Sequence, residues 1–161
     1  MQNKERRSKL AAMKSLYEPS TAQEVKARLN ALTPETPRLW GKMTAAQMLA
    51  HCANAMESAV GDRQPSRLFI GRILGPLVKP GFANDKPLHK NGPTAPWLIV
   101  ADDRDIPTER HRLTSLIDRF SQGGPEACTK HPHAFFGNLT AEEWGKGMYK
   151  HLDHHLQQFG V

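Results

Sequence analysis

Apolar residues recur at the spacing of an α-helix in four segments of the chain, and a helix-start signal precedes each segment. Three signals are capping boxes, in which a hydroxyl residue is followed three positions later by Glu or Gln; they lie at Ser20–Gln23, Thr44–Gln47 and Thr140–Glu143. The other signal is Pro107, which suits the first turn of a helix. The pattern predicts four amphipathic helices. Their apolar residues are, in chain order, Val25, Leu29 and Leu32; Met48, Leu49, Cys52, Met56 and Ala59; Leu113, Leu116, Ile117 and Phe120; and Met148, Leu152, Leu156 and Phe159.

The composition changes between residues 61 and 106, where six of the twelve prolines and five of the twelve glycines fall. This predicts a long connection between the second and third helices, with a short helix at residues 66–74 (SRLFIGRIL). No strand alternation is present, and the only run that could be extended is the short PWLIVADD segment. A weaker helical pattern with Leu10, Met13 and Tyr17 opens the chain. We therefore predict an all-α fold, a four-helix bundle with a long connection between helices 2 and 3.

The length of 161 residues is enough for one domain, residues 1–161, with residues 1–18 as a peripheral N-terminal segment. The chain carries 22 Lys and Arg against 16 Asp and Glu, and the resulting charge of +6 favours anionic partners weakly. A nucleic-acid partner is disfavoured, because the chain has no recognised binding motif and few aromatic residues for stacking.

The two cysteines, Cys52 and Cys128, form no CxxC pair, and one bridge would be a poor framework for a chain of this length. Reduced thiols are therefore expected. No apolar run reaches the length of a membrane span, and the charged start lacks the apolar core of a secretory signal. These features predict a cytoplasmic protein with no membrane partner, and they leave a homodimer open.

Three histidines, His151, His154 and His155, lie within five positions near the end of the chain. A helix turns about 100° per residue, so His151 and His155 lie one turn apart on the buried side of the last helix. His154 falls at the border of that side, and Asp153 falls on the opposite face, toward water. Two imidazoles at this spacing can reach one metal ion. Two histidines packed in a bundle, or a surface cluster, would show the same spacing, so the pattern alone leaves these alternatives open.

A further histidine, His51, lies on the second predicted helix, about 100° from the centre of the apolar face near Cys52. It shares a polar arc with Gln47, and this arc either faces solvent or forms the wall of a cavity between helices. Cys52 points into the apolar face, which favours structural burial over metal binding.

Two segments resemble the DinB/YfiT-like superfamily of metal-binding four-helix bundles, and more narrowly an uncharacterised bacterial branch of it. They are the W-x-x-M-x-x-x-Q-M-L-x-H-C pattern from Trp40 to Cys52 and HPHAFFGNLTAEEWGKGMYKHLDHHLQQFG near the C-terminus, supported by DDRDIPTERHRL. The resemblance implies an up-down-down-up bundle with one divalent metal ion, usually zinc or nickel, held by His51, His151 and His155. Superfamily members with assigned activities include transferases and isomerases that use small thiols, and some hydrolases.

A metal ion with three protein ligands keeps at least one open position, which is typical of catalytic sites. We therefore expect a metal-dependent hydrolase or a small-thiol-dependent transferase, acting on a small-molecule substrate such as a low-molecular-weight thiol. The alternative is a non-catalytic, metal-stabilised binding or stress-response scaffold. Leu152 follows His151, so the motif brings no glutamate base. The weak candidates for catalytic groups are His154 and His131, which can transfer protons, and Gln47, which can orient a water.

Overall fold

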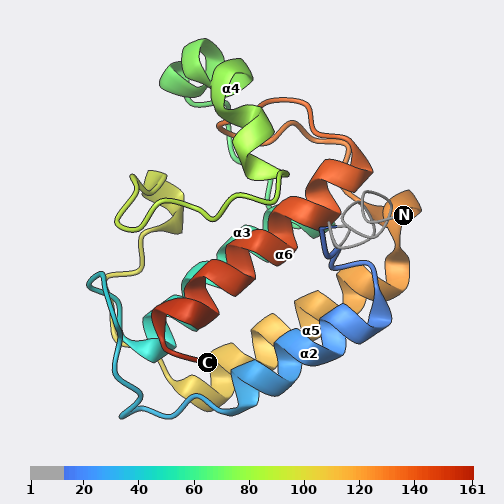
Figure 1. The fold of residues 1–161 in the computed structure, drawn as a ribbon. Helices are drawn as coiled ribbons and strands as arrows, with labels where there is room; N and C mark the ends of the chain where they lie inside the picture. Colours follow the sequence, from blue (N-terminus) through green and yellow to red (C-terminus); the bar gives the residue numbers. More distant parts are fainter. Residues whose placement is uncertain (1–12) are drawn as a thin grey trace, which may run out of the picture.

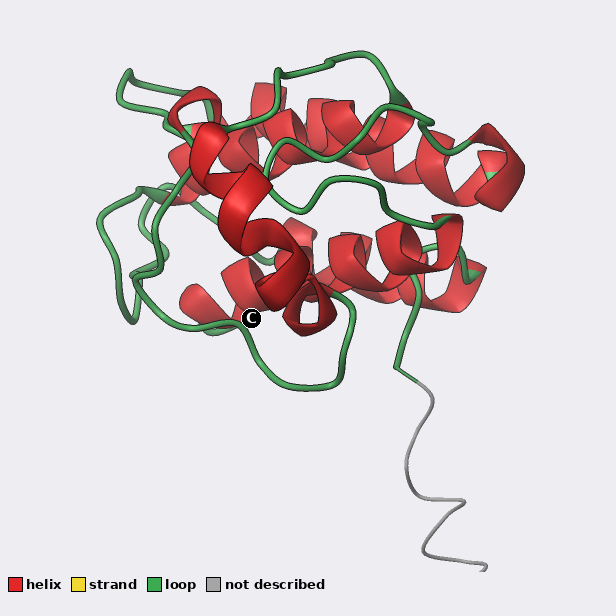
Figure 2. Cartoon of the chain, turned by 90° about the horizontal axis from the view of Figure 1, so that it is seen from above, coloured by secondary structure: helices red, strands yellow, loops and turns green. Residues whose placement is uncertain are grey.

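The computed structural model describes residues 13–161 as five α-helices joined by loops (Figure 1, Figure 2). The helices are α2 (Pro19–Asn30), α3 (Ala45–Val60), α4 (Phe69–Phe82), α5 (Ile106–Gly123) and α6 (Ala141–Gln158). Two short 3-10 helices, η1 (Pro96–Leu98) and η2 (Pro125–Ala127), lie in the connections. The described residues contain no β-strand, only an isolated bridge between His133 and Gly137. The prediction of an all-α fold is confirmed.

Helices α2, α3, α5 and α6 pack around one hydrophobic core (Figure 1). The most extensive contact joins α3 to α5, while α6 contacts both α3 and α2. Each buried Leu, Ile or Met contributes about 1.5–3 kcal/mol relative to an exposed one. The core residues that are fully or almost fully buried include Val25, Leu29, Met48, Leu49, Met56, Leu113, Ile117, Leu152 and Leu156. These are residues whose spacing predicted the helices, so the apolar faces meet as expected.

The capping boxes predicted at Thr44 and Thr140 both form. The hydroxyl of each threonine accepts a hydrogen bond from the backbone N–H three positions later, that of Gln47 at 3.2 Å and that of Glu143 at 3.1 Å. The Gln47 and Glu143 side chains accept in return from the threonine N–H groups. Asp105 caps α5, and the predicted proline lies in the first turn of that helix. The starts of α3, α5 and α6 are therefore determined by local sequence.

The predicted capping box at Ser20 is wrong. Helix α2 begins at Pro19, with Glu18 as its N-cap residue and no side-chain cap hydrogen bond. Ser20 already lies inside the first turn, so its hydroxyl does not cap the helix. The cause is Pro19, since the fixed φ of proline suits the first helical position and its missing N–H leaves one donor fewer to satisfy.

The weak helix predicted at the start of the chain lies only partly within the described residues, and Leu10 is outside them. Residues 13–15 have no regular structure and residues 16–18 form a turn, so this part of the helix prediction is wrong. Leu16 is completely buried, and its N–H donates to the carbonyl of Gly145 in α6 at 3.0 Å. Tyr17 stacks on Phe120 of α5 with ring centroids 4.6 Å apart. These tertiary contacts override a weak local helical preference.

Helix α4 is longer than the helix predicted at residues 66–74, because it continues through Pro76 and Pro80 to Phe82. Each proline removes one backbone N–H and normally ends a helix. The two prolines lie four residues apart and are both exposed, so the carbonyls that they leave unpaired are on the solvent side. The first three residues of the apolar run that begins at Pro96 form the 3-10 helix η1.

Candidate metal centre

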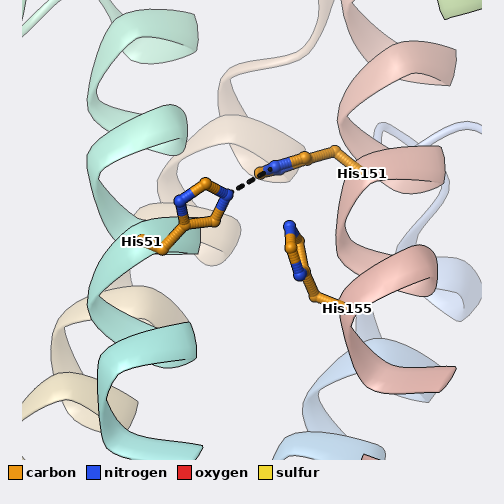
Figure 3. A group of neighbouring side chains, drawn as sticks. All are labelled: His51, His151 and His155. Carbon is orange, nitrogen blue, oxygen red and sulfur yellow. Dashed lines mark hydrogen bonds between the residues drawn. The ribbon is translucent and has the colours of Figure 1, made fainter. Parts of the chain in front are cut away.

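His51 of α3 meets His151 and His155 of α6 inside the bundle (Figure 3). Each residue offers one ring nitrogen, and these three nitrogens lie within 4.8 Å of one another. The Nε2 atoms of His51 and His151 are 3.1 Å apart. The one-turn spacing on α6 aligns His151 with His155, and the packing of α3 against α6 supplies His51. The structure thus brings together the three residues predicted as ligands, in a group that could hold one metal ion.

The cluster is largely screened from water. His51 and His155 expose only 4% and 8% of their surface, while His151 is partly exposed. The helical angle left open whether the polar arc of α3 faces solvent or the space between helices. At His51 it faces the interior of the bundle. Cys52 is also buried, but its thiol contacts the sulfur of Met48 at 3.7 Å and faces the core, as predicted.

A backbone carbonyl fixes the tautomer of His51. Its Nδ1 lies 2.9 Å from the carbonyl oxygen of Leu98, at the end of η1. Because a carbonyl oxygen can only accept, Nδ1 carries the proton and Nε2 keeps its lone pair. That lone pair points toward the two histidines of α6 (Figure 3). A hydrogen bond behind the ring of this kind typically orients a histidine that binds metal.

Gln158 has the same effect on His155. Its Oε1 lies 2.8 Å from Nδ1 of His155, and its Nε2 donates to the carbonyl of Trp40 at 2.8 Å. Since the amide nitrogen of Gln158 is the donor to Trp40, its oxygen is the acceptor from His155. Nδ1 of His155 is therefore protonated, and Nε2 carries the lone pair. Two of the three imidazoles are thus set in the tautomer that a metal ligand needs.

His151 has no such support. Its Nδ1 is buried and makes no hydrogen bond. Because Nε2 of His51 carries a lone pair, the 3.1 Å contact between the two Nε2 atoms requires a proton on Nε2 of His151 when no cation is bound. A cation shared by the two nitrogens would take the place of that proton. The donor set therefore fits a metal ion, with His151 as the ligand that lacks a partner behind its ring.

Burial lowers the pKa of all three histidines, because the charged imidazolium loses its hydration. The pKa of His155 falls to about 3. Burial and then the neighbouring histidines lower the pKa of His151 well below its usual range, and burial also lowers the pKa of His51. All three rings are therefore neutral at neutral pH, which is the form that binds metal.

His154, the first weak catalytic candidate, lies beside the cluster but outside the group of three. It is half-buried, and its ring packs against those of Trp40 and His155 with centroids 5.7 and 5.1 Å away. Burial lowers its pKa from the ordinary histidine range, so it is largely neutral at neutral pH. The helical angle had placed His154 at the border of the buried side of α6, and the structure agrees.

The other two weak candidates lie elsewhere. Nε2 of His131 is 3.2 Å from the carbonyl of Pro65, and His131 lines a hollow of about 280 Å³ that none of the three clustered histidines lines. The amide of Gln47 belongs to the capping box of α3 and also donates to the carbonyl of Asp102 at 3.2 Å. Neither side chain is brought to the cluster.

The helical angle placed Asp153 toward water, but its side chain is only partly exposed and is paired with α2. Its carboxylate accepts from Arg28 of α2 at 2.7 Å and from Gln157 at 2.7 Å. The angle correctly placed Asp153 away from α3, but α2 packs against α6 there. A helix of a bundle has two neighbours, and a count on one helix cannot show the second.

The sequence did not reveal the groups behind the candidate ligands, which are Gln158 and the carbonyls of Leu98 and Trp40. Gln158 lies one turn after His155, and this spacing is a signal that could have been used. The two carbonyls belong to the backbone of connecting segments, so no side chain indicates them.

A protein-family model with the description "Protein of unknown function (DUF1569)" matches residues 12–160. No curated protein matches the chain, and no solved structure does. Among the helices of residues 13–161, none has the length and apolar character needed to cross a membrane.

Proposed function

The chain belongs to the DUF1569 family, whose function is unknown, and we propose that it binds one divalent metal ion through His51, His151 and His155. The observation that carries this proposal is the orientation of the Nε2 lone pairs of His51 and His155, fixed by Leu98 and Gln158, toward a common point. Three neutral imidazoles suit zinc or nickel.

The fold assignment that accompanies this function is a DinB-like up-down-down-up bundle, with α4 in the long connection. The course of the helices in Figure 1 supports it, because α3 and α5 run in one direction and α2 and α6 in the other. In this arrangement the ligands come from two antiparallel neighbours, α3 and α6, whose contact surrounds the site.

For the reaction, we propose either hydrolysis of a small-molecule substrate or transfer of a group from that substrate onto a low-molecular-weight thiol. An ion held by His51, His151 and His155 would supply Lewis-acid chemistry. His154, half-buried against His155 and outside the three proposed ligands, is the candidate for transferring a proton. Leu98 and Gln158 keep two of the ligands oriented, which preorganises the site.

The burial of His51 and His155 favours a second candidate, in which the ion only stabilises the bundle as a non-catalytic scaffold. A cobalt-substituted sample separates the two. In the enzyme, added imidazole or a small thiol binds the cobalt and changes its absorption spectrum. In the scaffold, the spectrum does not respond until the protein unfolds.

The experiment that tests metal binding is elemental analysis of the purified protein. We expect one ion per chain, and a sharp loss in His151→Ala and in His155→Ala. His154→Ala is the matched control on the same helix, and His111→Ala is an exposed control on α5; both should keep the metal. Full occupancy in a double variant, His151→Ala with His155→Ala, would overturn the proposal.

A further inference from the structure

Helix α4 exposes a face of large apolar side chains. Eight large hydrophobic residues of the described chain are exposed, and six of them lie on this one helix. Contiguous apolar surface of this kind on a folded domain usually marks an interaction site. The six residues and their exposed fractions are Phe69 (78%), Ile70 (51%), Ile73 (56%), Leu74 (40%), Leu77 (77%) and Val78 (45%).

The opposite face of α4 is fixed to the protein by small residues. A side chain at Gly71 or Gly75 would collide with the carbonyl oxygen of Phe135, so the helix backbone lies directly on that loop. At the end of the helix, Phe82 is buried and stacks on Phe136 with ring centroids 4.7 Å apart. Because this side is anchored, the apolar side is held outward.

Lys150 of α6 holds the last turn of α4 and the segment that follows it. Its ammonium group donates to the carbonyl of Gly81 at 2.5 Å and to the carbonyl and side-chain oxygens of Asn84 at 3.2 and 2.9 Å. The helix stands apart from the four core helices (Figure 1), and its large apolar side chains are exposed.

The charge around the apolar face is positive. Residues 63–84 contain Arg63, Arg67, Arg72 and Lys79 and no acidic residue. Arg63 and Lys79 are paired with glutamates of α3 and α6. Arg72 is exposed and lies about 60° beyond the edge of the apolar face, counting 100° per residue. The whole chain also carries +6.

We propose that the outer face of α4 docks reversibly on an anionic lipid bilayer, with the helix lying in the plane of the headgroups. Helices that bind in this way combine a continuous apolar face with basic residues at its margin. A helix of 14 residues is too short to span a bilayer, so the docking is peripheral. The lack of a spanning segment predicted no membrane partner, and peripheral docking through α4 differs from that expectation.

A second copy of the chain fits the face less well. The helix is roughly 21 Å long, and one such face offers less than the approximately 800 Å² per partner that a stable interface needs. Two copies would also bring their Arg72 residues together with no acidic residue of α4 to pair with them. An anionic bilayer supplies both an apolar layer and negative charge.

The test is sedimentation of the full-length protein with sucrose-loaded vesicles. One set contains equal parts of phosphatidylglycerol and phosphatidylcholine, and the other contains phosphatidylcholine alone. We expect binding to the anionic vesicles, weaker binding at high salt, and little binding to phosphatidylcholine. In Phe69→Trp, the emission added by the new indole should move to shorter wavelength with anionic vesicles only.

Vesicle binding of two variants in α4 and one control variant outside it tests whether α4 is the binding element. Leu77→Ser should weaken binding by roughly tenfold, because an apolar side chain leaves the interface. Arg72→Gln should weaken it about fivefold. Leu39→Ser is the matched control, because Leu39 is 65% exposed but lies outside α4. All three positions are exposed, so the variants should keep the far-UV circular dichroism and melting temperature of the wild type.

Failure of the wild type to sediment with anionic vesicles would overturn the proposal. An equal loss of binding in Leu39→Ser and Leu77→Ser would overturn it too. If the protein instead forms a dimer in analytical ultracentrifugation that Leu77→Ser dissociates, without any vesicle binding, the face belongs to a second copy and the proposal is wrong.

Discussion

Gln158 holds His155 in the tautomer of a metal ligand, through a 2.8 Å hydrogen bond between its Oε1 and Nδ1 of the imidazole. Replacing Gln158 by leucine removes this acceptor and leaves the ring free to change tautomer. We expect metal affinity to fall by about 10- to 100-fold. The measurement is a competition titration of the metal-free protein against a chromophoric chelator.

The neighbouring glutamine provides the control. Gln157 is exposed and bonds Asp153 instead of a histidine, so Gln157→Leu should bind metal like the wild type. Gln158→Glu keeps an acceptor for Nδ1 and should bind metal more tightly than Gln158→Leu, although it loses the hydrogen bond to the carbonyl of Trp40. Equal affinities of Gln158→Leu and the wild type would show that the hydrogen bond plays no part in metal binding.

The second prediction concerns the start of α6, the helix that carries two of the proposed ligands. Thr140→Ala removes the cap and should lower the free energy of unfolding by about 1 kcal/mol. Ser20→Ala is the comparison, since the sequence suggests the same kind of cap there but the structure shows none. Its effect should stay within about 0.5 kcal/mol. Urea unfolding measures both, and similar losses in the two variants would contradict the assigned helix starts.

The comparison of Thr140 with Ser20 shows what local sequence can determine. At Thr44 and Thr140 nothing competes with the capping box, and the helices begin where predicted. At Ser20 the preceding proline takes the first helical position, and the box does not form. The full length of α4 was hidden for a related reason, because Pro76 normally indicates a helix end and the contacts that hold α4 come from a distant loop.

The candidate site was also predictable only where local sequence determines it. The four-residue spacing of His151 and His155 follows from helix geometry, so their common direction could be read from the chain. The burial of His51 could not, because its ring is covered and oriented by the carbonyl of Leu98 in another connection. The ion pair of Asp153 could not be predicted either, because its partner, Arg28, belongs to a helix far away in sequence.

The third prediction concerns the pH dependence of stability and rests on His133. Burial, followed by the charge of Arg67, lowers the pKa of His133 to about 4. Its Nδ1 accepts hydrogen bonds from the N–H groups of Phe135 and Phe136, at 3.1 and 3.2 Å. In the unfolded chain the ring binds a proton near pH 6.5, its ordinary pKa. Between pH 6.5 and 4 the unfolded state therefore binds more protons, and the free energy of unfolding falls as the pH falls, by about 1.4 kcal/mol per pH unit for this group.

Urea unfolding of the metal-free protein at several pH values between 7.5 and 4.5 measures this slope. His133→Asn keeps an acceptor near the position of Nδ1 but does not titrate. Its stability should therefore fall less steeply with acid than that of the wild type. Identical slopes would mean that His133 does not stay neutral in the folded protein.

The fourth prediction concerns the contact between α4 and α6. A side chain at Gly147 would overlap the ring of Phe82, so Gly147→Ala should destabilise the protein by about 1–3 kcal/mol through overpacking. This loss exceeds the helix-propensity gain of up to about 1 kcal/mol from Gly to Ala. In a Phe82→Ala background the collision is absent, and the same substitution should be neutral or stabilising. A double-mutant cycle by urea unfolding measures the difference, and equal effects in both backgrounds would contradict the contact.

The most direct test of the metal centre is X-ray absorption at the zinc edge of the zinc-loaded, full-length protein. We expect a shell with three imidazole nitrogens at about 2.0–2.1 Å, one each from His51, His151 and His155. In His51→Ala the fit should lose one imidazole, and in His154→Ala it should keep all three. A shell without imidazole, or one that His51→Ala leaves unchanged, would contradict the assignment of these three histidines as the metal ligands.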